Sequence, residues 1–233
     1  MTLGTIHNRE KFLEHISKKM GSVRKQEVIR PVRQYQPQLK VFAEMSQEQL
    51  LDELINSCGR IHTDVILTDS ASIETVLEKR IEVHGGGPIV AAEDVRFLGF
   101  GLGYLLERED VHKWNSALGE QNIEIAEKAN IGIMFSDMTL AESGTVVIFN
   151  DKSKARAISL LPTTFIAIIP KSTIVPRLTQ AAQEIDRRIE AGETIASCIN
   201  FISGPSNSAD IEYNLVVGVH GPIRVTYIVV EDR

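Results

Sequence analysis

The sequence predicts a three-layer α/β fold, with a mixed, mostly parallel sheet that carries helices on both faces. The strand-length run "TFIAIIP" is apolar along most of its length and "TDVILTD" is apolar at its centre, as in a sheet buried on both sides. These runs alternate with segments of helical spacing, which is typical of α/β domains. Connections between Ile131 and Ile169 are short, so we expect part of the sheet to be antiparallel.

The N-terminal part, residues 1–45, is predicted to form a helix and an extended arm ahead of the main domain. Asn8 is placed to cap the helix. The apolar positions of this helix recur with a period near 3.6 residues: Phe12, Leu13, Ile16 and Met20. Residues 21–42 contain Pro31 and Pro37 and show no clear period, which indicates an arm running over the surface or over a neighbouring subunit.

The α/β domain, residues 46–233, is predicted to begin with a helix at Ser46. Gln49 lies three residues further on and completes a capping box. Apolar residues mark the buried stripe of this helix: Leu50, Leu51, Leu54 and Ile55. A strand over residues 63–69, a helix over 70–80 and a strand over 88–94 follow.

The second half of this domain is expected to be richer in strands. Residues 105–130 are predicted to be mostly helical. Four strand candidates come next: "IGIMFSD", "GTVVIFN", "RAISLLP" and "TFIAIIP". Residues 172–192 keep apolar residues on one helical face and end at Gly192, a helix-stop signal. The runs "LVVGVH" and "RVTYIVVED" are predicted as the last strands.

Composition excludes several classes of protein. The chain has 233 residues and a net charge of −6, so it lacks the general basic field of a nucleic-acid-binding protein. No apolar run reaches the roughly 20 residues that a transmembrane helix requires. The two cysteines, Cys58 and Cys198, form no disulfide framework and no cluster motif, and a reducing cytoplasm is the expected setting. The histidines fit no ligand spacing, so we predict no metal site.

The stretch "LAESGTVVI" places one carboxylate, Glu142, between apolar residues. Gly144 allows the chain to turn with positive φ, so one interpretation is a hairpin with Glu142 in solvent. Buried flanks favour another interpretation, since a carboxylate at a buried turn must be paired or its pKa rises. Glu142 is therefore a candidate catalytic residue, with Ser143, Gly144 and Thr145 as candidate ligand-binding residues.

The loop "ISGPSNSADIE" is a second candidate for ligand binding. Successive backbone N–H groups and hydroxyls of such a loop can form an anion-binding concavity. The alternative is a helix N-terminus capped by Ser208 or Asp210, and helix N-termini also bind anions. The nearby His220, in "GVHGP", is usually read as a structural hydrogen bonder. The predicted ligand-binding positions of this region are Gly204, Pro205, Ser206, Ser208, Asp210 and His220.

These two stretches are expected to face each other. Ligands of open α/β sheets bind in a cleft at the strand ends. We therefore predict that residues 142–145 and the loop 204–210 line one cleft, with His220 nearby.

Four motifs in the same order, "AESGTVV", "SLLPTTFIAIIP", "SGPSNSADIE" and "GVHGP", resemble the lactate-utilisation (LUD) domain family over nearly the whole chain. The resemblance implies the fold type of sugar-phosphate isomerases and CoA transferases. It also implies a role in oxidising L-lactate to pyruvate together with two iron–sulfur partner proteins. This chain lacks the four thiolates of a [4Fe–4S] cluster, so we expect the clusters on the partners; its own cofactor is unknown.

Other functions stay open beside this one. Glu142 and Gly144 are similar to the Glu-x-Gly turn whose glutamate is the nucleophile of CoA transferases, so a stand-alone acyl-transfer or isomerase-like enzyme is one alternative. The other alternative is a non-catalytic scaffold or ligand sensor, for which the arm over residues 21–42 would make subunit contacts. A small-molecule ligand and a homo-oligomer are compatible with each.

Overall fold

The computed structural model of the protein describes residues 6–23, 34–211 and 213–232, without the side chains of residues 210 and 211. The chain divides into two compact units, residues 1–37 and 38–233. The predicted boundary between residues 45 and 46 stays a prediction.

The described residues of the smaller unit include the predicted helix, α1 (Arg9–Lys19). Asn8 precedes this helix with a left-handed backbone (φ 59°), and its side chain makes no capping hydrogen bond, so the predicted cap is wrong. No residue of α1 is buried. The predicted arm over residues 21–42 lies partly outside the described residues; its described part includes the 3₁₀ turn η1 (Pro37–Leu39).

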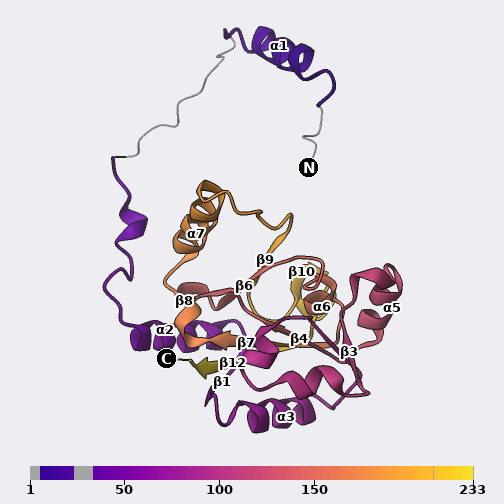
Figure 1. The fold of residues 1–233 in the computed structure, drawn as a ribbon. Helices are drawn as coiled ribbons and strands as arrows, with labels where there is room; N and C mark the ends of the chain where they lie inside the picture. The colour runs from indigo at the N-terminus through magenta and orange to yellow at the C-terminus, as the bar shows by residue number, and fades with distance from the viewer. Residues whose placement is uncertain (1–5, 24–33, 212, 233) are drawn as a thin grey trace. The chain divides into compact units, whose positions relative to one another are not determined.

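The larger unit is built on a six-stranded sheet in the order β1-β12-β7-β4-β2-β3 (Figure 1). Every neighbouring pair in this sheet is parallel. The central strand β7 pairs with both neighbours along its length; Ile168, for example, lies between Ile228 and Phe135. The strands are β1 (Asp64–Asp69), β2 (Ile89–Ala91), β3 (Val111–Lys113), β4 (Ile131–Phe135), β7 (Thr164–Pro170) and β12 (Arg224–Glu231).

Both faces of this sheet are buried, which explains the continuous apolar runs of its strands. Side chains of β7 alternate between the faces: Phe165 and Ile169 on one, Ile166 and Ile168 on the other. The first face packs against α2 (Gln47–Arg60), α5 (Gln121–Lys128) and α6 (Ala157–Leu160). The second face packs against α3 (Ile73–Val83), α4 (Arg96–Gly99) and η2 (Gly103–Glu107). The predicted three-layer, mostly parallel α/β class is confirmed.

The short connections between Ile131 and Ile169 predicted antiparallel pairing within the main sheet, but the structure places that pairing in a separate, second sheet. Its four strands run in the order β8-β5-β6-β9: β5 (Met138–Leu140), β6 (Thr145–Phe149), β8 (Ile174–Val175) and β9 (Ile199–Ile202). Val146 and Ile148 of β6 pack into the same core as α2, whereas Val147 and Phe149 pack against α7 (Leu178–Glu190). Figure 1 shows α7 on the side of this sheet away from α3.

The remaining elements are short. η3 (Ser116–Leu118), η4 (Ala141–Ser143) and η5 (Lys171–Thr173) are single 3₁₀ turns. β10 (Asn207–Ile211) and β11 (Asn214–Val217) form an antiparallel hairpin of their own.

The capping box that begins α2 is confirmed. Ser46 Oγ accepts from Gln49 N–H, and Gln49 Oε1 accepts from Ser46 N–H at 2.8 Å. Leu50, Leu51 and Leu54 are buried as predicted, but Ile55 is 37% exposed, so the buried stripe is narrower than expected.

Two expected elements differ from the structure. Residues 105–130 contain the short strand β3 and the eight-residue α5 rather than mostly helix, because Val111–Lys113 pairs with β2 at the sheet edge. The run "RAISLLP", predicted as a strand, is the helical turn α6. A short apolar run does not separate a buried strand from a buried helical turn.

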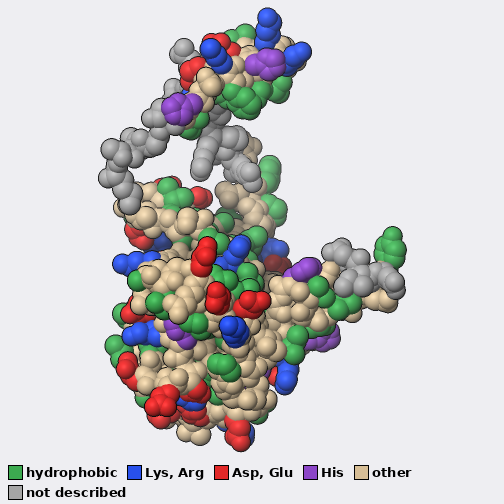
Figure 2. All heavy atoms as spheres, turned by 90° about the vertical axis from the view of Figure 1, so that its right-hand side faces the viewer, with side chains coloured by type: hydrophobic (Ala, Val, Ile, Leu, Met, Phe, Trp, Pro, Cys, Tyr) green, Lys and Arg blue, Asp and Glu red, His purple; other side chains and the backbone are tan. Residues whose placement is uncertain are grey.

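The charges on the surface are mixed in sign. Figure 2 shows acidic and basic side chains interspersed on one face of the larger unit. Such mixing is typical of a solvated surface without a single dominant field. Within the described residues, no helix combines the length and hydropathy that crossing a bilayer requires.

Candidate functional site

The turn around Glu142 joins β5 to β6 through η4 and lies against the C-terminal half of α2. Gly144 has the predicted positive φ of 61°, and a Cβ there would lie 2.8 Å from Ile61 Cδ1. Both backbone polar groups of Glu142 are hydrogen-bonded: its N–H donates to Pro176 O (3.1 Å), and its carbonyl accepts from Ser57 Oγ (2.9 Å). The hairpin is therefore a closely packed turn.

The Glu142 carboxylate has a partner from another element. Arg177, the residue before α7, donates from Nε to Glu142 Oε2 at 2.6 Å. The side chain of Glu142 is 39% exposed and that of Arg177 is 25% exposed. The carboxylate is thus half-buried and ion-paired, and any covalent chemistry at this oxygen requires the ion pair to open.

Hydroxyl groups connect the turn to the predicted loop. Thr145 Oγ1 lies 2.7 Å from Ser143 Oγ and 2.6 Å from Ser203 Oγ. Gly204, with φ 71°, packs on Ile61 as Gly144 does; its Cβ would lie 2.6 Å from Ile61 O. The structure therefore places Gly144 and Thr145 beside the start of the loop.

Tyr227 of β12 joins the two glycine turns from inside the core. Its hydroxyl donates toward Gly144 O (3.0 Å) and Ile202 O (3.1 Å) and accepts from Gly204 N–H (3.4 Å). Burial raises the pKa of this phenol, so it stays protonated near neutral pH. The Tyr227 hydroxyl is a structural tie between β6, β9 and the loop.

Removal of this hydroxyl tests the tie. Tyr227→Phe is expected to lower the free energy of unfolding by about 1–3 kcal/mol, because buried backbone groups lose their partner. Denaturant unfolding of the purified variant measures the change. Tyr35→Phe, at an 88% exposed position, is the control and should change stability by less than about 0.5 kcal/mol. Equal effects of the two substitutions would contradict the proposed tie.

The rest of the predicted loop packs on the β11–β12 connection rather than beside Glu142. Pro205 is buried, and Ser206 N–H donates to Pro222 O (2.9 Å). His220 is exposed, and its backbone N–H donates to Ser206 Oγ (3.3 Å). Ser208, paired with Val216, lies in β10. The helix-cap alternative is wrong, because the loop leads into a strand; the side chain of Asp210 lies outside the described residues.

A different cluster lies at the carboxyl ends of the parallel strands. From β2 the chain continues to β3, the neighbour of β2 on one side of the sheet. From β4 it continues to β7, the neighbour of β4 on the other side. The sheet therefore has a topological switch point between β2 and β4. Ligands of open α/β sheets bind in the crevice at such a point. This cluster was not predicted from the sequence, although "PIVAAED" and "IGIMFSD" each end in an aspartate.

Arg96 is the centre of this cluster. Its Nη2 lies 2.6 Å from Asp94 Oδ2 and 2.9 Å from Asp137 Oδ1, and its Nη1 donates to Ser136 O (2.9 Å). Burial alone would raise the pKa of Asp94, but hydrogen bonds and charge from Arg96 outweigh it and hold that pKa below its ordinary value. Lys154 Nζ adds a second cation 3.5 Å from Asp137 Oδ1.

Asp137 also fixes the second sheet to this point. Its Oδ2 accepts from Phe149 N–H at 2.7 Å, at the end of β6. The segment after β6 therefore returns to the switch point and covers it with Asp151, Ser153 and Lys154.

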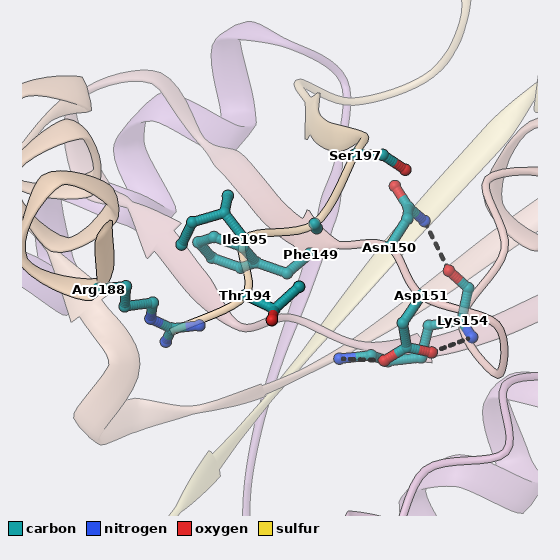
Figure 3. A pocket seen from close by; sticks show the side chains of 9 residues that line it. Phe149, Asn150, Asp151, Lys154, Arg188, Thr194, Ile195 and Ser197 are labelled. Atoms are coloured by element: carbon teal, nitrogen blue, oxygen red, sulfur yellow. Dashed lines mark hydrogen bonds and ion pairs between the residues drawn. The ribbon is translucent and has the colours of Figure 1, made fainter. Parts of the chain in front are cut away.

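Two cavities meet at this segment and share Asp151 and Lys154. One, of about 440 Å³, lies over the switch point and includes Asp94, Arg96 and Asp137. The other, of about 460 Å³, lies between the segment and α7 (Figure 3). Its lining is Phe149, Asn150, Asp151, Lys154, Arg188, Thr194, Ile195, Ala196 and Ser197. Both volumes suit a small ligand.

Among the residues whose side chains the structure describes, no three His, Cys, Asp or Glu side chains group so as to hold a metal ion. The aspartates of the switch point bind Arg96 and Lys154 instead.

The LUD domain model matches residues 51–230, which covers both sheets and both glycine turns. The chain belongs to the LUD domain family. The resemblance noted from four sequence motifs is confirmed.

Curated relatives of this LUD domain chain are similar to it along the full length. Three of them are named lactate utilization protein C, and in each case the match covers 100% of both chains. They come from Geobacillus kaustophilus (strain HTA426), 56% identical, Macrococcus caseolyticus (strain JCSC5402), 52%, and Bacillus subtilis (strain 168), 49%. These relatives support a role in lactate utilisation.

A solved structure shares the fold of this LUD domain chain. It is the crystal structure of a DUF162 family protein from Deinococcus radiodurans, with a TM-score of 0.56 and 15% sequence identity. The match covers 80% of this chain and 99% of the other. At this identity the likeness shows the fold alone.

Proposed function

We propose that this LUD domain chain is a component of an L-lactate utilisation system and acts in the oxidation of L-lactate to pyruvate with two iron–sulfur partner proteins. The observation that carries the proposal is the full-length identity of 49–56% to relatives named lactate utilization protein C. Sequence identity at this level over the full length of both chains supports a shared role.

The chemistry of the chain supports a division of labour within such a system. Oxidation of lactate to pyruvate releases two electrons and two protons, so an electron carrier is required. The two cysteines of this chain, Cys58 and Cys198, are unpaired and too few to hold a [4Fe–4S] cluster. Iron–sulfur partners would supply the carrier, and a cytoplasmic location, where thiols stay reduced, belongs to the same proposal.

Acyl transfer through Glu142 is less well supported by the geometry. A nucleophilic carboxylate needs a free oxygen directed at the substrate. Arg177 Nε binds Oε2 of the Glu142 carboxylate at 2.6 Å, so this oxygen is free for a substrate only when the ion pair opens. The scaffold alternative depends on the arm over residues 21–42, of which residues 24–33 lie outside the described part of the chain.

Genetic removal of this chain tests the proposal. A strain that lacks it is expected to lose growth on L-lactate as carbon source, whereas growth on pyruvate is unchanged, because pyruvate enters after the oxidation step. Restoration by the full-length chain is the control, and cell extracts should show the matching loss of lactate-dependent electron transfer. Undiminished growth on lactate without the chain would contradict the proposal.

A further inference from the structure

Within the described part of the chain, one helix packs on the face of the second sheet that points away from α2. This helix is α7, which packs on Val147 and Phe149 of β6. The sheet has four strands about 4.8 Å apart, and a helix with its side chains is about 10 Å across, so a full layer over this face takes two helices. The edge strand β9 lies beyond β6 (Figure 1), and the second helix position is above it.

The two sides of α7 differ in chemistry. Gln180, Gln183 and Arg187 line a cavity with Met138 of β5 and Val175 of β8, so this side of the helix lies toward β5 and β8. Residues two apart on a helix do not share a side. The side toward β9 therefore carries the apolar stripe of α7, at positions i, i+4, i+7 and i+11: Leu178, Ala182, Ile185 and Ile189.

Most of this stripe is uncovered. Leu178 is 57% exposed, Ile189 is 56% exposed, and Ala182 between them is exposed as well. Phe201 of β9 is 42% exposed, and it pairs with Val147, so its side chain lies on the same face of the sheet as α7. We call the area formed by Leu178, Ala182, Ile189 and Phe201 the α7–β9 surface. It lies where a second helix would pack.

The charge beside this surface is negative. Asp186 is exposed and lies one helical turn from both Ala182 and Ile189, and the exposed Glu190 follows one turn later. The arginines of α7 pair with other carboxylates, so Asp186 and Glu190 have no ion-pair partner among the described residues. Basic groups on a partner would complement this flank, and acidic groups would be repelled.

We propose that the α7–β9 surface binds an amphipathic helix of a partner protein, with the apolar side of that helix on the surface and its basic residues beside Asp186 and Glu190. The bound helix lies about 8–10 Å from α7, the usual distance between packed helices. It covers Phe201, and the small side chain of Ala182 allows the close approach. The surface is argued from the fold alone, so it is independent of the proposed role in lactate utilisation.

A helix in this position lies close to the Glu142 turn. Arg177, which directly precedes Leu178, donates to Glu142 Oε2 at 2.6 Å. Ser203, two residues beyond Phe201, has its Oγ 2.6 Å from Thr145 Oγ1. Partner binding and the candidate residues of this turn therefore meet at one end of the α7–β9 surface.

Model peptides test the proposal on the purified full-length chain. The probe is a Leu/Lys peptide of about 14 residues with leucine at i, i+4, i+7 and i+11, which as a helix is about as long as α7. Fluorescence anisotropy of the labelled peptide measures its affinity. We expect saturable binding, at least tenfold tighter than that of a scrambled peptide of the same composition or of a Leu/Glu peptide with the same pattern. Absence of saturable binding, or equal affinities of the Leu/Lys peptide and either control peptide, would overturn the proposal.

A matched pair of variants assigns the apolar contact. Ile189→Gln is expected to weaken binding of the Leu/Lys peptide by roughly fivefold or more, because it puts an amide into the apolar surface. Ile123→Gln makes the same change on α5, at a side chain that is 45% exposed, and should leave the affinity unchanged. Thermal unfolding shows that both variants are folded. Equal losses in the two variants would contradict the proposed contact.

A second pair assigns the charge. The double variant Asp186→Asn, Glu190→Gln is expected to weaken the Leu/Lys peptide several-fold and to reduce the salt dependence of its binding. The double variant Glu124→Gln, Glu127→Gln removes two exposed carboxylates from α5 and is the control, with no change expected. Equal effects of the two double variants would assign binding to the general acidity of the chain and overturn the proposal.

A second copy of this chain is the other candidate occupant of the surface. Analytical ultracentrifugation of the chain without peptide separates the two. The proposal expects the same oligomeric state for the native chain and for Ile189→Gln. A dimer that this substitution dissociates would assign the α7–β9 surface to self-association and overturn the proposed partner helix.

Discussion

Replacing Arg96 by methionine is expected to lower the free energy of unfolding by about 3–5 kcal/mol, the usual cost of breaking a buried ion pair from one side. The side chains of Asp94 and Asp137 are only 6% and 15% exposed, and Arg96 binds both. Methionine fills a similar volume but leaves the two buried carboxylates with Lys154 as their nearby cation, and Lys154 forms its ion pairs with Asp137 and Asp151 rather than with Asp94. Chemical denaturation at neutral pH measures the change.

The dependence of this effect on pH identifies its cause. In the native protein the pKa of Asp94 is lowered, so its contribution to stability is present above the ordinary value of about 3.9 and is lost as the pH falls through the folded pKa. Without Arg96, burial raises the pKa of Asp94, and its protonated form is favoured in the folded state. The difference between the two proteins should therefore begin to shrink above about pH 4, as Asp94 of the variant becomes protonated, and should shrink further as the pH falls through the lowered pKa of Asp94 in the native protein. Arg60→Met, at a 63% exposed side chain, should cost less than about 1 kcal/mol. A difference independent of pH would contradict the electrostatic explanation.

Gly132→Ala is expected to destabilise the protein by about 3 kcal/mol, at the upper end of the usual range for overpacking. Gly132 is the second residue of β4, and a Cβ there would lie 1.9 Å from Ile158 O of α6 and 3.2 Å from Pro162 Cγ. The obstacle is a backbone carbonyl, which no side-chain rotation can move, so α6 would have to shift away from the sheet. Thermal and denaturant unfolding measure the loss.

Gly59→Ala is the matched control. Gly59 lies near the end of α2, and a Cβ there would meet nothing within 4 Å. Alanine in a helix is favoured over glycine by about 0.5–1 kcal/mol, so this variant should be as stable as the native protein or more stable. A Gly132→Ala protein with native stability would mean that α6 does not pack on β4 as described.

The fold was largely predictable because its signals are local. The apolar runs of β4 and β7 are continuous, since helices and the second sheet bury both faces of the main sheet. The capping box at Ser46 is complete within four residues of sequence. One wrong prediction has a non-local cause. The run "RAISLLP" has the hydropathy of a strand, but it folds as the helical turn α6, which packs against Gly132 of β4; no pattern within the run predicts this contact.

The candidate site was less predictable because its partners are distant in sequence. Arg177 pairs with Glu142 across 35 residues, and "RLTQAAQEID" reads only as a helix start. Arg96 stands two residues beyond Asp94, but Asp137 reaches it from another strand end, 41 residues away. Strand-end aspartates were the available signal for the switch point. Asn150 Nδ2 donates to Lys154 O, and Oδ1 is buried without a partner; this depends on the orientation of one amide, which no sequence pattern predicts.

Strand β6 separates two features of the molecule. The Glu142 turn precedes this strand, and Asn150 and Asp151 follow it; five residues at about 3.3 Å each span roughly 16 Å. All five are buried, so the strand cannot slide without moving side chains out of the core. The strand therefore acts as a rigid spacer, and a substitution in the loop at one end need not displace the loop at the other.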